Sequence, residues 1–225
     1  RALKMHGGVP KQELNTENVE AVTKGFSNLQ KAIENMRYFN VPVLVAINKF
    51  ASDTDAEIAE LTRLCDEFGV PVELNECWEK GGEGGTDMAK KVVELLEGPK
   101  PTPKFVYDLE DSLEDKVNKI VKTIYGGDGV IFTDKAKKQI KQLADWGLDR
   151  LPVCMAKTQY SLSDNPALLG APTGFTITVS DIRVANGAGF IVCRTGDVMV
   201  MPGLPKRPAA LNMDIEADGT IKGLF

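Results

Sequence analysis

The sequence predicts an α/β fold, in which a mostly parallel sheet with flanking helices is followed by a smaller α+β module. The first observation is a short apolar run over residues 43–47, which is rich in β-branched side chains and typical of a strand buried in a parallel sheet. The second is the alternation of such runs with amphipathic helical patterns. The third is the mainly β pattern towards the end of the chain, which indicates a second module.

Composition and charge exclude several classes of protein. The chain has 225 residues, of which 43% are hydrophobic and 26% charged, as in an ordinary folded domain, so we exclude general disorder. A formal charge of -5 argues against non-specific binding to nucleic acid or to an anionic membrane. No apolar run reaches the roughly 18 residues that a transmembrane helix needs, and no signal peptide is recognisable. We therefore expect a soluble cytoplasmic protein without nucleic-acid or membrane partners.

The cysteines and the histidine indicate no metal site. Cys65, Cys77, Cys154 and Cys193 lie far apart without a C-x-x-C pair, in apolar or mixed surroundings. Buried reduced thiols explain this spacing better than zinc ligands or disulfides. His6 is the only histidine, and its place beside two glycines favours a loop residue over a ligand. We expect no metal to be bound by this chain alone.

Residues 1–98 are expected to form the α/β module. A helix capped by Asn15 or Thr16 places apolar side chains such as Phe26 and Ile33 in one stripe that faces the sheet. A second helix starts at capping residues over 52–55 and closes at Gly69. In order, the expected elements are a loop over 1–14, a helix over 15–38, a strand over 43–47, a helix up to 68, a strand over 70–74, a loop over 75–85 and a helix over 86–96.

Residues 104–225 are expected to form the α+β module, after a proline-rich connector over 98–103. The sequence NGAG over 186–189 is typical of a hairpin turn, and a final hairpin is expected around Asp218 and Gly219. In order, the expected elements are a strand over 105–107, a helix over 112–124, a strand over 130–132, a basic helix over 133–147, and strands over 151–156, 174–184 and 189–194.

Polar and aromatic side chains follow two of the expected strands, where ligands bind in open α/β folds. Asn48, Lys49 and Phe50 come directly after the first strand, and Trp78 lies in the loop after the second. Two aromatic rings at neighbouring strand ends can hold a flat heterocycle between them, which is worth about 0.5–1.5 kcal/mol per stacked pair beyond the burial of area. Glycines in the loop over 81–85 would let it act as a hinge or lid. Two ordinary, partly buried aromatic side chains explain these residue types equally well.

Asn48 and Lys49 also resemble the start of the N-K-x-D loop with which P-loop GTPases read guanine. Ala51 stands where that loop has its carboxylate, and Asp53 follows two residues late. The sequence G-x-x-x-x-G-K-[ST], which cradles phosphates, does not occur in the chain. A GTPase-like nucleotide module is therefore the weakest hypothesis for this protein.

Other polar groups are weaker indications of chemistry. Lys157, Tyr160 and Asp164 follow an expected strand and suit contact with an anion or carboxylate, but a solvated loop is the favoured interpretation. The lysines of the basic helix over 133–147 are better explained as a solvated face than as a phosphate site. With one histidine, no Ser-His-Asp or Cys-His arrangement is indicated, so we assign no catalytic residue.

Several unusual segments, spread over essentially the whole chain, resemble formate–tetrahydrofolate ligase, also called 10-formyltetrahydrofolate synthetase. They are residues 1–8 (RALKMHGG), 45–50 (VAINKF), 124–126 (IYG), 157–161 (KTQYS), 201–205 (MPGLP) and 223–225 (GLF). The resemblance implies a P-loop NTPase-like sheet and an enzyme of one-carbon metabolism that joins formate to tetrahydrofolate with ATP, through formyl phosphate. In that family the Walker-type loop lies in the N-terminal half, so the chain is similar to the C-terminal portion of such an enzyme.

The resemblance also implies site residues and partners. Phe50 and Trp78 match the two aromatic positions that stack the pterin, and Leu74 matches a neighbouring apolar wall. The residues expected near the nucleotide are Asn48, Lys49, Thr173 and Gly174. Tetrahydrofolate and formate are the implied co-substrates, while ATP and Mg2+, with room for a monovalent cation, are expected to bind through an N-terminal portion of the enzyme. Because the family's enzymes are tetramers, we expect a homo-oligomer.

Two further hypotheses of different class stay open. The chain is either the folate-side portion of the ligase, inactive alone because it lacks the phosphate loop, or a non-catalytic remnant that only binds folate or assembles. Addition of a separately made N-terminal portion discriminates between them, because restored ATP-dependent formylation would exclude the remnant.

Overall fold

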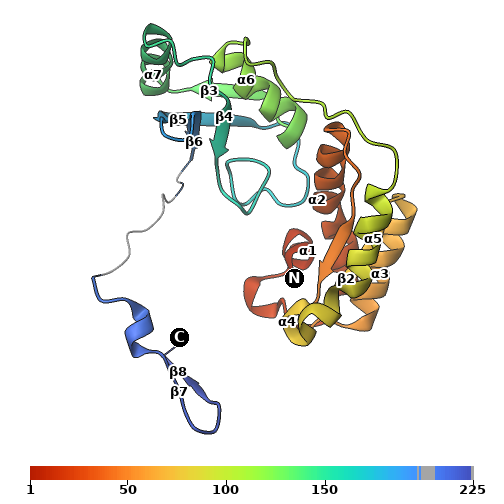
Figure 1. Ribbon diagram of the computed structural model, residues 1–225. Helices are drawn as coiled ribbons and strands as arrows, with labels where there is room; N and C mark the ends of the chain where they lie inside the picture. Colours follow the sequence, from red (N-terminus) through yellow and green to blue (C-terminus); the bar gives the residue numbers. More distant parts are fainter. Residues whose placement is uncertain (197, 199–205, 224–225) are drawn as a thin grey trace.

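Two separate sheets, each packed against helices, organise the chain (Figure 1). The computed structural model describes residues 1–196, 198 and 206–223, so the segment 201–205 and the last two residues, singled out in the sequence, lie outside the described residues. The prediction of an α/β fold with a smaller α+β part is confirmed. The division into modules at residues 98–104 stays a prediction.

The first sheet pairs β1 (Val45–Asn48) with β2 (Val72–Asn75) in parallel, with Asn48 opposite Asn75 at the carboxyl ends. The helices α2 (Val19–Tyr38), α3 (Asp55–Glu67) and α5 (Thr86–Leu96) accompany it. Phe26 and Ile33 of α2 lie in its buried core with Val45 of β1, as the predicted apolar stripe requires. The core therefore fixes β1 from one side through α2.

The predicted loop over 1–14 is wrong, because it contains the helix α1 (Ala2–His6) and the 3₁₀ turn η1 (Lys11–Glu13). The reason is tertiary packing between α1 and α2. A Cβ atom added to Gly7 would lie 2.1 Å from the carbonyl oxygen of Ala21, and one added to Gly25 would lie 1.9 Å from that of Leu3. Glycine at both positions lets the two helix backbones touch, and this contact stabilises a helix too short to form alone.

The ends of α2 and α3 follow local capping rules. Asn18 caps α2 by accepting the N–H of Ala21 at 2.9 Å, so the start predicted at Asn15 or Thr16 was a few residues early. Thr54 forms a capping box with Glu57 at the start of α3, and Gly69, with φ 68°, follows its end as predicted.

The segment over 75–85, predicted to be an open loop, folds as the short helix α4 (Cys77–Lys80) and the 3₁₀ turn η2 (Gly81–Gly85). The N–H of Glu76 donates to the carbonyl of Gly84 at 3.0 Å and closes the segment on itself. A Cβ atom on Gly84 would lie 2.5 Å from the carbonyl carbon of Glu76, so this position needs a glycine for packing.

The second sheet has the order β3-β5-β6-β4, with β3 parallel to β5, β4 parallel to β6, and β5 antiparallel to β6. Its core centres on Ile177 and Ile191 of the sheet and on Val117 of a covering helix. The elements are α6 (Leu113–Ile120), the π turn η3 (Val121–Tyr125), β3 (Gly129–Phe132), α7 (Asp134–Asp145), β4 (Val153–Ala156), β5 (Thr176–Ala185) and β6 (Phe190–Thr195).

The strand predicted over 105–107 is absent from the structure, although the strand-forming residues are there. Tyr107 instead turns its hydroxyl to β4, where it accepts the N–H of Val153 at 2.9 Å. One side chain therefore satisfies part of the free edge of β4 in place of a backbone partner.

The last described residues form η4 (Ala209–Asn212) and a small hairpin of β7 (Asp214–Ile215) and β8 (Ile221–Lys222). This hairpin is confirmed around Asp218 and Gly219, and Gly219 has φ 87° in the turn.

The helix α2 also contacts the part of the chain that carries the second sheet (Figure 1). Asn28, Lys31 and Asn35 donate to the carbonyl oxygens of Gly170, Thr123 and Ile124 at 2.8, 3.1 and 2.8 Å. The donors recur at steps of three and four residues, so they share one face of the helix.

Candidate functional site

The carboxyl ends of β1 and β2 carry a network of charged side chains. Glu76 lies 3.2 Å from the ammonium of Lys49 and 2.7 Å from that of Lys80. The hydrogen bonds from Lys80 and Lys49 lower the pKa of Glu76 below its ordinary value. Two cations thus share one carboxylate beside Asn48 and Asn75. Three further carboxylates, those of Glu73, Glu83 and Asp87, line the same hollow as Lys80, so this edge carries charges of both signs.

Three exposed apolar side chains lie around this network. Phe50 is 45% exposed, Leu74 36% and Trp78 87%. Neither Phe50 nor Trp78 stacks on another aromatic ring within the described residues. Large apolar side chains exposed together at a strand end are typical of a surface that covers a ligand or a partner. The structure therefore brings the predicted aromatic residues to one end of the first sheet and leaves them accessible.

Phe50 is held by a tight turn. Its N–H donates to Oδ2 of Asp53 at 2.9 Å, and the N–H of Asp53 donates to the carbonyl oxygen of Phe50 at 2.9 Å. The guanidinium of Arg1 lies 5.3 Å from the centroid of the Phe50 ring, in the range of a cation–π contact. Phe50, Asp53 and Asn48 line a cavity of about 430 Å³ between α1, α2 and β1.

Thr173 lies elsewhere, in a cleft of about 320 Å³ between α2 and the segment that precedes β5. Lys31 and Tyr125 share this cleft, and Gly174 follows it with φ 71°. The four residues expected near a nucleotide thus fall into two groups, since Asn48 and Lys49 lie at the end of β1. The sequence pattern did not lead us to Lys31, which also lines this cleft. Its helical spacing from Asn28 and Asn35 was the signal that could have placed the three side chains on one face of α2.

The polar cluster Lys157, Tyr160 and Asp164 mainly stabilises its own loop. The ammonium of Lys157 donates to the carbonyl oxygens of Thr158, at 2.9 Å, and Ser161, and burial lowers its pKa. Asp164 accepts the N–H of Thr178 at 2.8 Å, and Tyr160 is 44% exposed. The favoured interpretation of a solvated loop therefore holds for Tyr160 only, because Lys157 is partly buried and Ser161 and Ser163 are buried in the loop.

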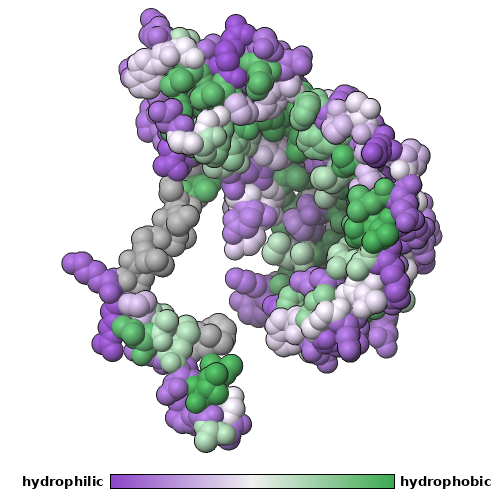
Figure 2. Space-filling view, viewed as in Figure 1, coloured by the Kyte–Doolittle hydropathy of each residue, from purple (hydrophilic) through white to green (hydrophobic). Residues whose placement is uncertain are grey.

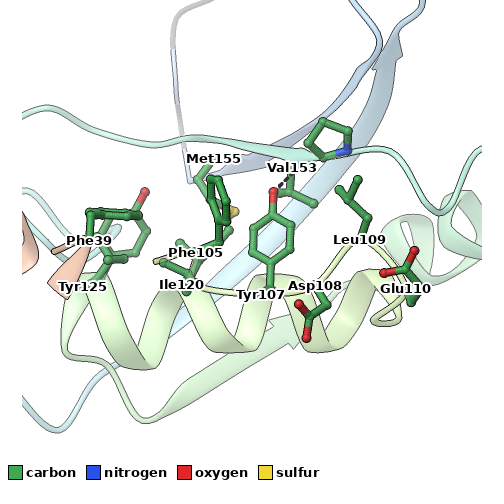
Figure 3. Close-up of a pocket in the computed structure, with 13 residues that line it drawn as sticks. Phe39, Phe105, Tyr107, Asp108, Leu109, Glu110, Ile120, Tyr125, Val153 and Met155 are labelled. Atoms are coloured by element: carbon green, nitrogen blue, oxygen red, sulfur yellow. Dashed lines mark hydrogen bonds between the residues drawn. The ribbon is translucent and has the colours of Figure 1, made fainter. Parts of the chain in front are cut away.

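A larger cavity, of about 730 Å³, lies beside the free edge of β4 (Figure 3). In Figure 3 the hydroxyl of Tyr107 points towards Val153, with Phe105 and Met155 next to them. The walls are mainly apolar, and Phe105 is 78% exposed. Sequence reasoning missed this cavity because it interpreted the same aromatic residues as a strand.

The remaining predictions concern metals, thiols and membranes. In the described part of the chain, no three His, Cys, Asp or Glu side chains gather in a way that could hold a metal ion. Cys65 and Cys193 are buried as predicted, whereas Cys77 and Cys154 are exposed.

His6 ends α1, and its Nδ1 accepts the N–H of Gly170 at 3.1 Å, so it is not a loop residue. Among the described helices, none combines the length and apolar character needed to cross a membrane.

Parallel strands flanked by helices define this molecule as an α/β protein, and its aromatic and charged side chains lie at the carboxyl ends of two strands, where open α/β sheets generally bind ligands. The family model described as formate–tetrahydrofolate ligase matches residues 1–225, which is the whole chain. The chain therefore belongs to the formate–tetrahydrofolate ligase family, as the sequence segments indicated. The family implies a ligase with ATP and tetrahydrofolate as substrates.

Proposed function

We propose that this chain supplies the folate-binding part of a ligase that joins formate to tetrahydrofolate, using ATP, to give 10-formyltetrahydrofolate. The single observation that carries the proposal is the exposure of Phe50 and Trp78 at adjacent strand ends in a member of this family. Exposed aromatic rings cost hydration free energy, and a flat ligand that stacks on them recovers it.

In the proposed complex, Phe50 and Trp78 enclose the pterin and Leu74 forms an apolar wall. Arg1 covers part of Phe50, so the pterin takes the remaining face of the ring or displaces the guanidinium. Lys49 and Lys80 both pair with the carboxylate of Glu76 at the same edge.

We propose two steps, in which formate first attacks the γ-phosphorus of ATP to give formyl phosphate and ADP. The N10 amine of tetrahydrofolate then attacks the formyl carbon, and inorganic phosphate leaves as the amine loses its proton. The contribution of this chain is orientation of the amine, an effect worth on the order of 7–11 kcal/mol at best. Within the described residues we assign no acid, base or nucleophile to either step.

The phosphates of ATP are proposed to bind to an N-terminal portion of the enzyme that carries a phosphate loop. The outer edge of β1 suits such a partner. Val45 and Lys49 donate their N–H groups to Pro71 and Asn75 at 2.9 and 3.2 Å, so the N–H groups of the alternate residues point away from β2. A strand edge of this kind can pair with a further strand. Asn48, Lys49, Thr173 and Gly174 are proposed to lie near the nucleotide after that pairing.

No Mg2+ site is proposed for this chain, because its described carboxylates form no cluster that fits the ion. A homo-oligomer is proposed from the exposed apolar face of α5, where Val92, Val93 and Leu96 are 41%, 54% and 73% exposed. Figure 2 shows apolar side chains gathered over this helix. Burial of such a face between copies would remove it from water.

The proposal is tested by mixing the chain with a separately made N-terminal portion of a family member and measuring ATP-dependent formation of 10-formyltetrahydrofolate. We expect activity only in the mixture, and we expect the activity of Trp78→Ala to be at least tenfold lower. Loss of an aromatic side chain that the bound ligand buries costs about 2 kcal/mol or more. Trp146→Ala is the matched control, because Trp146 is 60% exposed and lies at the end of α7. No activity in the mixture, or equal activity with Trp78→Ala, would contradict the proposal.

A further inference from the structure

Gly170 is held through both of its backbone polar groups. Its N–H donates to Nδ1 of His6 at 3.1 Å, and its carbonyl oxygen accepts from the side-chain amide of Asn28 at 2.8 Å. The backbone of Gly170 has φ 70°, and an added Cβ atom would lie 2.8 Å from Oγ of Ser27, so this position requires glycine. Side chains of α1 and α2 therefore bind one residue of the segment that precedes β5.

The contacts of Gly170 hold one wall of a cleft. The segment before it is braced internally, because Oγ of Ser161 donates to the carbonyl oxygen of Leu168 at 2.5 Å. Thr173 follows three residues after Gly170 and lines the cleft of about 320 Å³, which it shares with Lys31 of α2. The two walls of this cleft are α2 and residues 171–173, so the hydrogen bonds of Gly170 keep them next to each other.

The hydrogen bond to His6 requires a neutral imidazole. Nδ1 accepts the N–H of Gly170 only while it carries no proton, because a protonated ring has two donors and no acceptor. Burial lowers the pKa of His6 below its ordinary value of 6.5, so the ring is neutral at pH 7. Acidification therefore turns the acceptor into a donor that faces another N–H.

Neighbouring charges do not set this titration. Burial alone lowers the pKa of His6, and the positions of α2 closest to α1 are the uncharged Ala21 and Gly25. The charged side chains of the elements packed around His6 contact other partners or are exposed. They are Arg1 and Lys4 of α1, which contact Phe50 and Glu57, Lys31 of α2 and Asp164, which contact Thr123 and Thr178, and the exposed Glu20, Lys24, Glu34 and Arg37 of α2.

We propose that His6 is a positioning residue, which in its neutral form holds residues 168–174 against α2 and, once protonated, releases them and widens the cleft beside Thr173. The effect on the reaction rests on the proposed function, in which Thr173 lies near the nucleotide, whereas the contact itself does not. Binding of ATP to the assembled enzyme would weaken as the pH falls through the pKa of His6.

Nuclear magnetic resonance of the full chain tests the contact, because the chain has a single histidine. The imidazole resonances give the protonation of His6 between about pH 5 and 8, and the protection of the Gly170 amide from hydrogen exchange, relative to its intrinsic rate, reports its hydrogen bond. We expect this protection to fall about fivefold as His6 is protonated, the effect of losing one ordinary hydrogen bond. A Gly170 amide that does not respond to the titration of His6 would overturn the inference.

Two variants separate positioning from a merely structural role. His6→Asn supplies an amide oxygen close to the place of Nδ1 and does not titrate, whereas His6→Leu removes the acceptor. KM for ATP is measured against pH for each chain mixed with a separately made N-terminal portion of a family member. The comparison with His6→Asn also accounts for the titration of ATP itself.

We expect KM of the wild type to rise about fivefold on acidification, His6→Asn to restore the low KM without this rise, and His6→Leu to have the high KM throughout. Thermal unfolding of each variant shows that the fold is intact. Identical pH profiles of the wild type and His6→Asn would overturn the inference while the proposed function stands. Absence of formylation in every mixture would contradict the proposed function, and a Gly170 amide that still follows His6 would support the contact.

Discussion

The ammonium of Lys4 lies 2.9 Å from the carboxylate of Glu57, and the two side chains are only 1% and 6% exposed. Lys4 also donates to the carbonyl oxygen of Thr16 at 3.1 Å, and Glu57 accepts the N–H of Asn18 at 2.7 Å. This buried pair joins α1 to α3 and to the cap of α2. It therefore holds the segment that carries Arg1 against the cavity beside Phe50.

Removal of one partner of this pair is expected to destabilise the fold strongly. Lys4→Met leaves the buried carboxylate of Glu57 without its cation, and breaking such a pair costs about 3–5 kcal/mol. Lys90→Met is the control, because Lys90 forms an exposed pair with Asp87, and such pairs contribute about 0–1 kcal/mol. Urea unfolding followed by circular dichroism measures both. Equal stability of the two variants would show that the buried pair contributes little.

The same pair predicts a dependence of stability on pH. Burial alone would raise the pKa of Glu57, but hydrogen bonds from Lys4 and from the backbone of Asn18 and Thr54 outweigh it and hold the pKa below its ordinary value. A carboxylate with a lowered pKa in the folded state adds stability above its unfolded pKa and loses it as the pH falls through the folded pKa. The wild-type chain should therefore lose more unfolding free energy on acidification below its ordinary pKa of about 4.5 than Glu57→Gln does. Parallel pH profiles of the two would refute this.

The contact between α1 and α2 predicts a severe effect of a single methyl group. Gly25→Ala would place its Cβ 1.9 Å from the carbonyl oxygen of Leu3, so the helices must separate. We expect a loss of about 1–3 kcal/mol, typical of overpacking. Gly187→Ala, where an added Cβ meets no atom within 4 Å, should change stability by less than about 0.5 kcal/mol. Thermal unfolding distinguishes them, and a neutral Gly25→Ala would show that α1 does not pack on α2.

The packing of the helical turn around Trp78 predicts that two glycine-to-alanine variants differ in their affinity for tetrahydrofolate. Gly84→Ala places a methyl group 2.5 Å from the Glu76 carbonyl and should distort the turn, whereas Gly82→Ala meets nothing within 4 Å. We expect tetrahydrofolate affinity to fall about fivefold in the first and to stay within twofold in the second, since loss of one stacking contact is worth about 1 kcal/mol. Equal affinities would show that the turn does not position Trp78 for the ligand.

Local signals in the sequence predicted most of the fold. The caps expected over 52–55, Gly69 and the NGAG turn each act within a few residues, so their outcomes were readable without tertiary structure. The helix α1 was missed because its reason, the close contact of Gly7 and Gly25 with other backbone atoms, joins residues distant in sequence. The strand expected over 105–107 failed because a side-chain hydroxyl of Tyr107 took the place of a backbone partner.

The candidate site was predictable only in part. Residue pattern selected Phe50 and Trp78, family resemblance gave them a role and added Leu74, and the structure adds that all three are exposed at one sheet end. The hydrogen bond from Gly170 to His6 joins residues far apart in the sequence, and composition and spacing do not specify it. Buried charges and long-range hydrogen bonds are tertiary properties, so they could be found only in the folded chain.

The central claim, that Phe50 and Trp78 hold the pterin, is tested most directly by tryptophan fluorescence during titration of the chain with tetrahydrofolate. The chain has two tryptophans, so Trp78→Phe and Trp146→Phe are titrated beside the wild type. Saturable quenching in the wild type and in Trp146→Phe, lost in Trp78→Phe, is the predicted result. Quenching that persists in Trp78→Phe, or none at all in a chain that circular dichroism shows to be folded, would contradict the account.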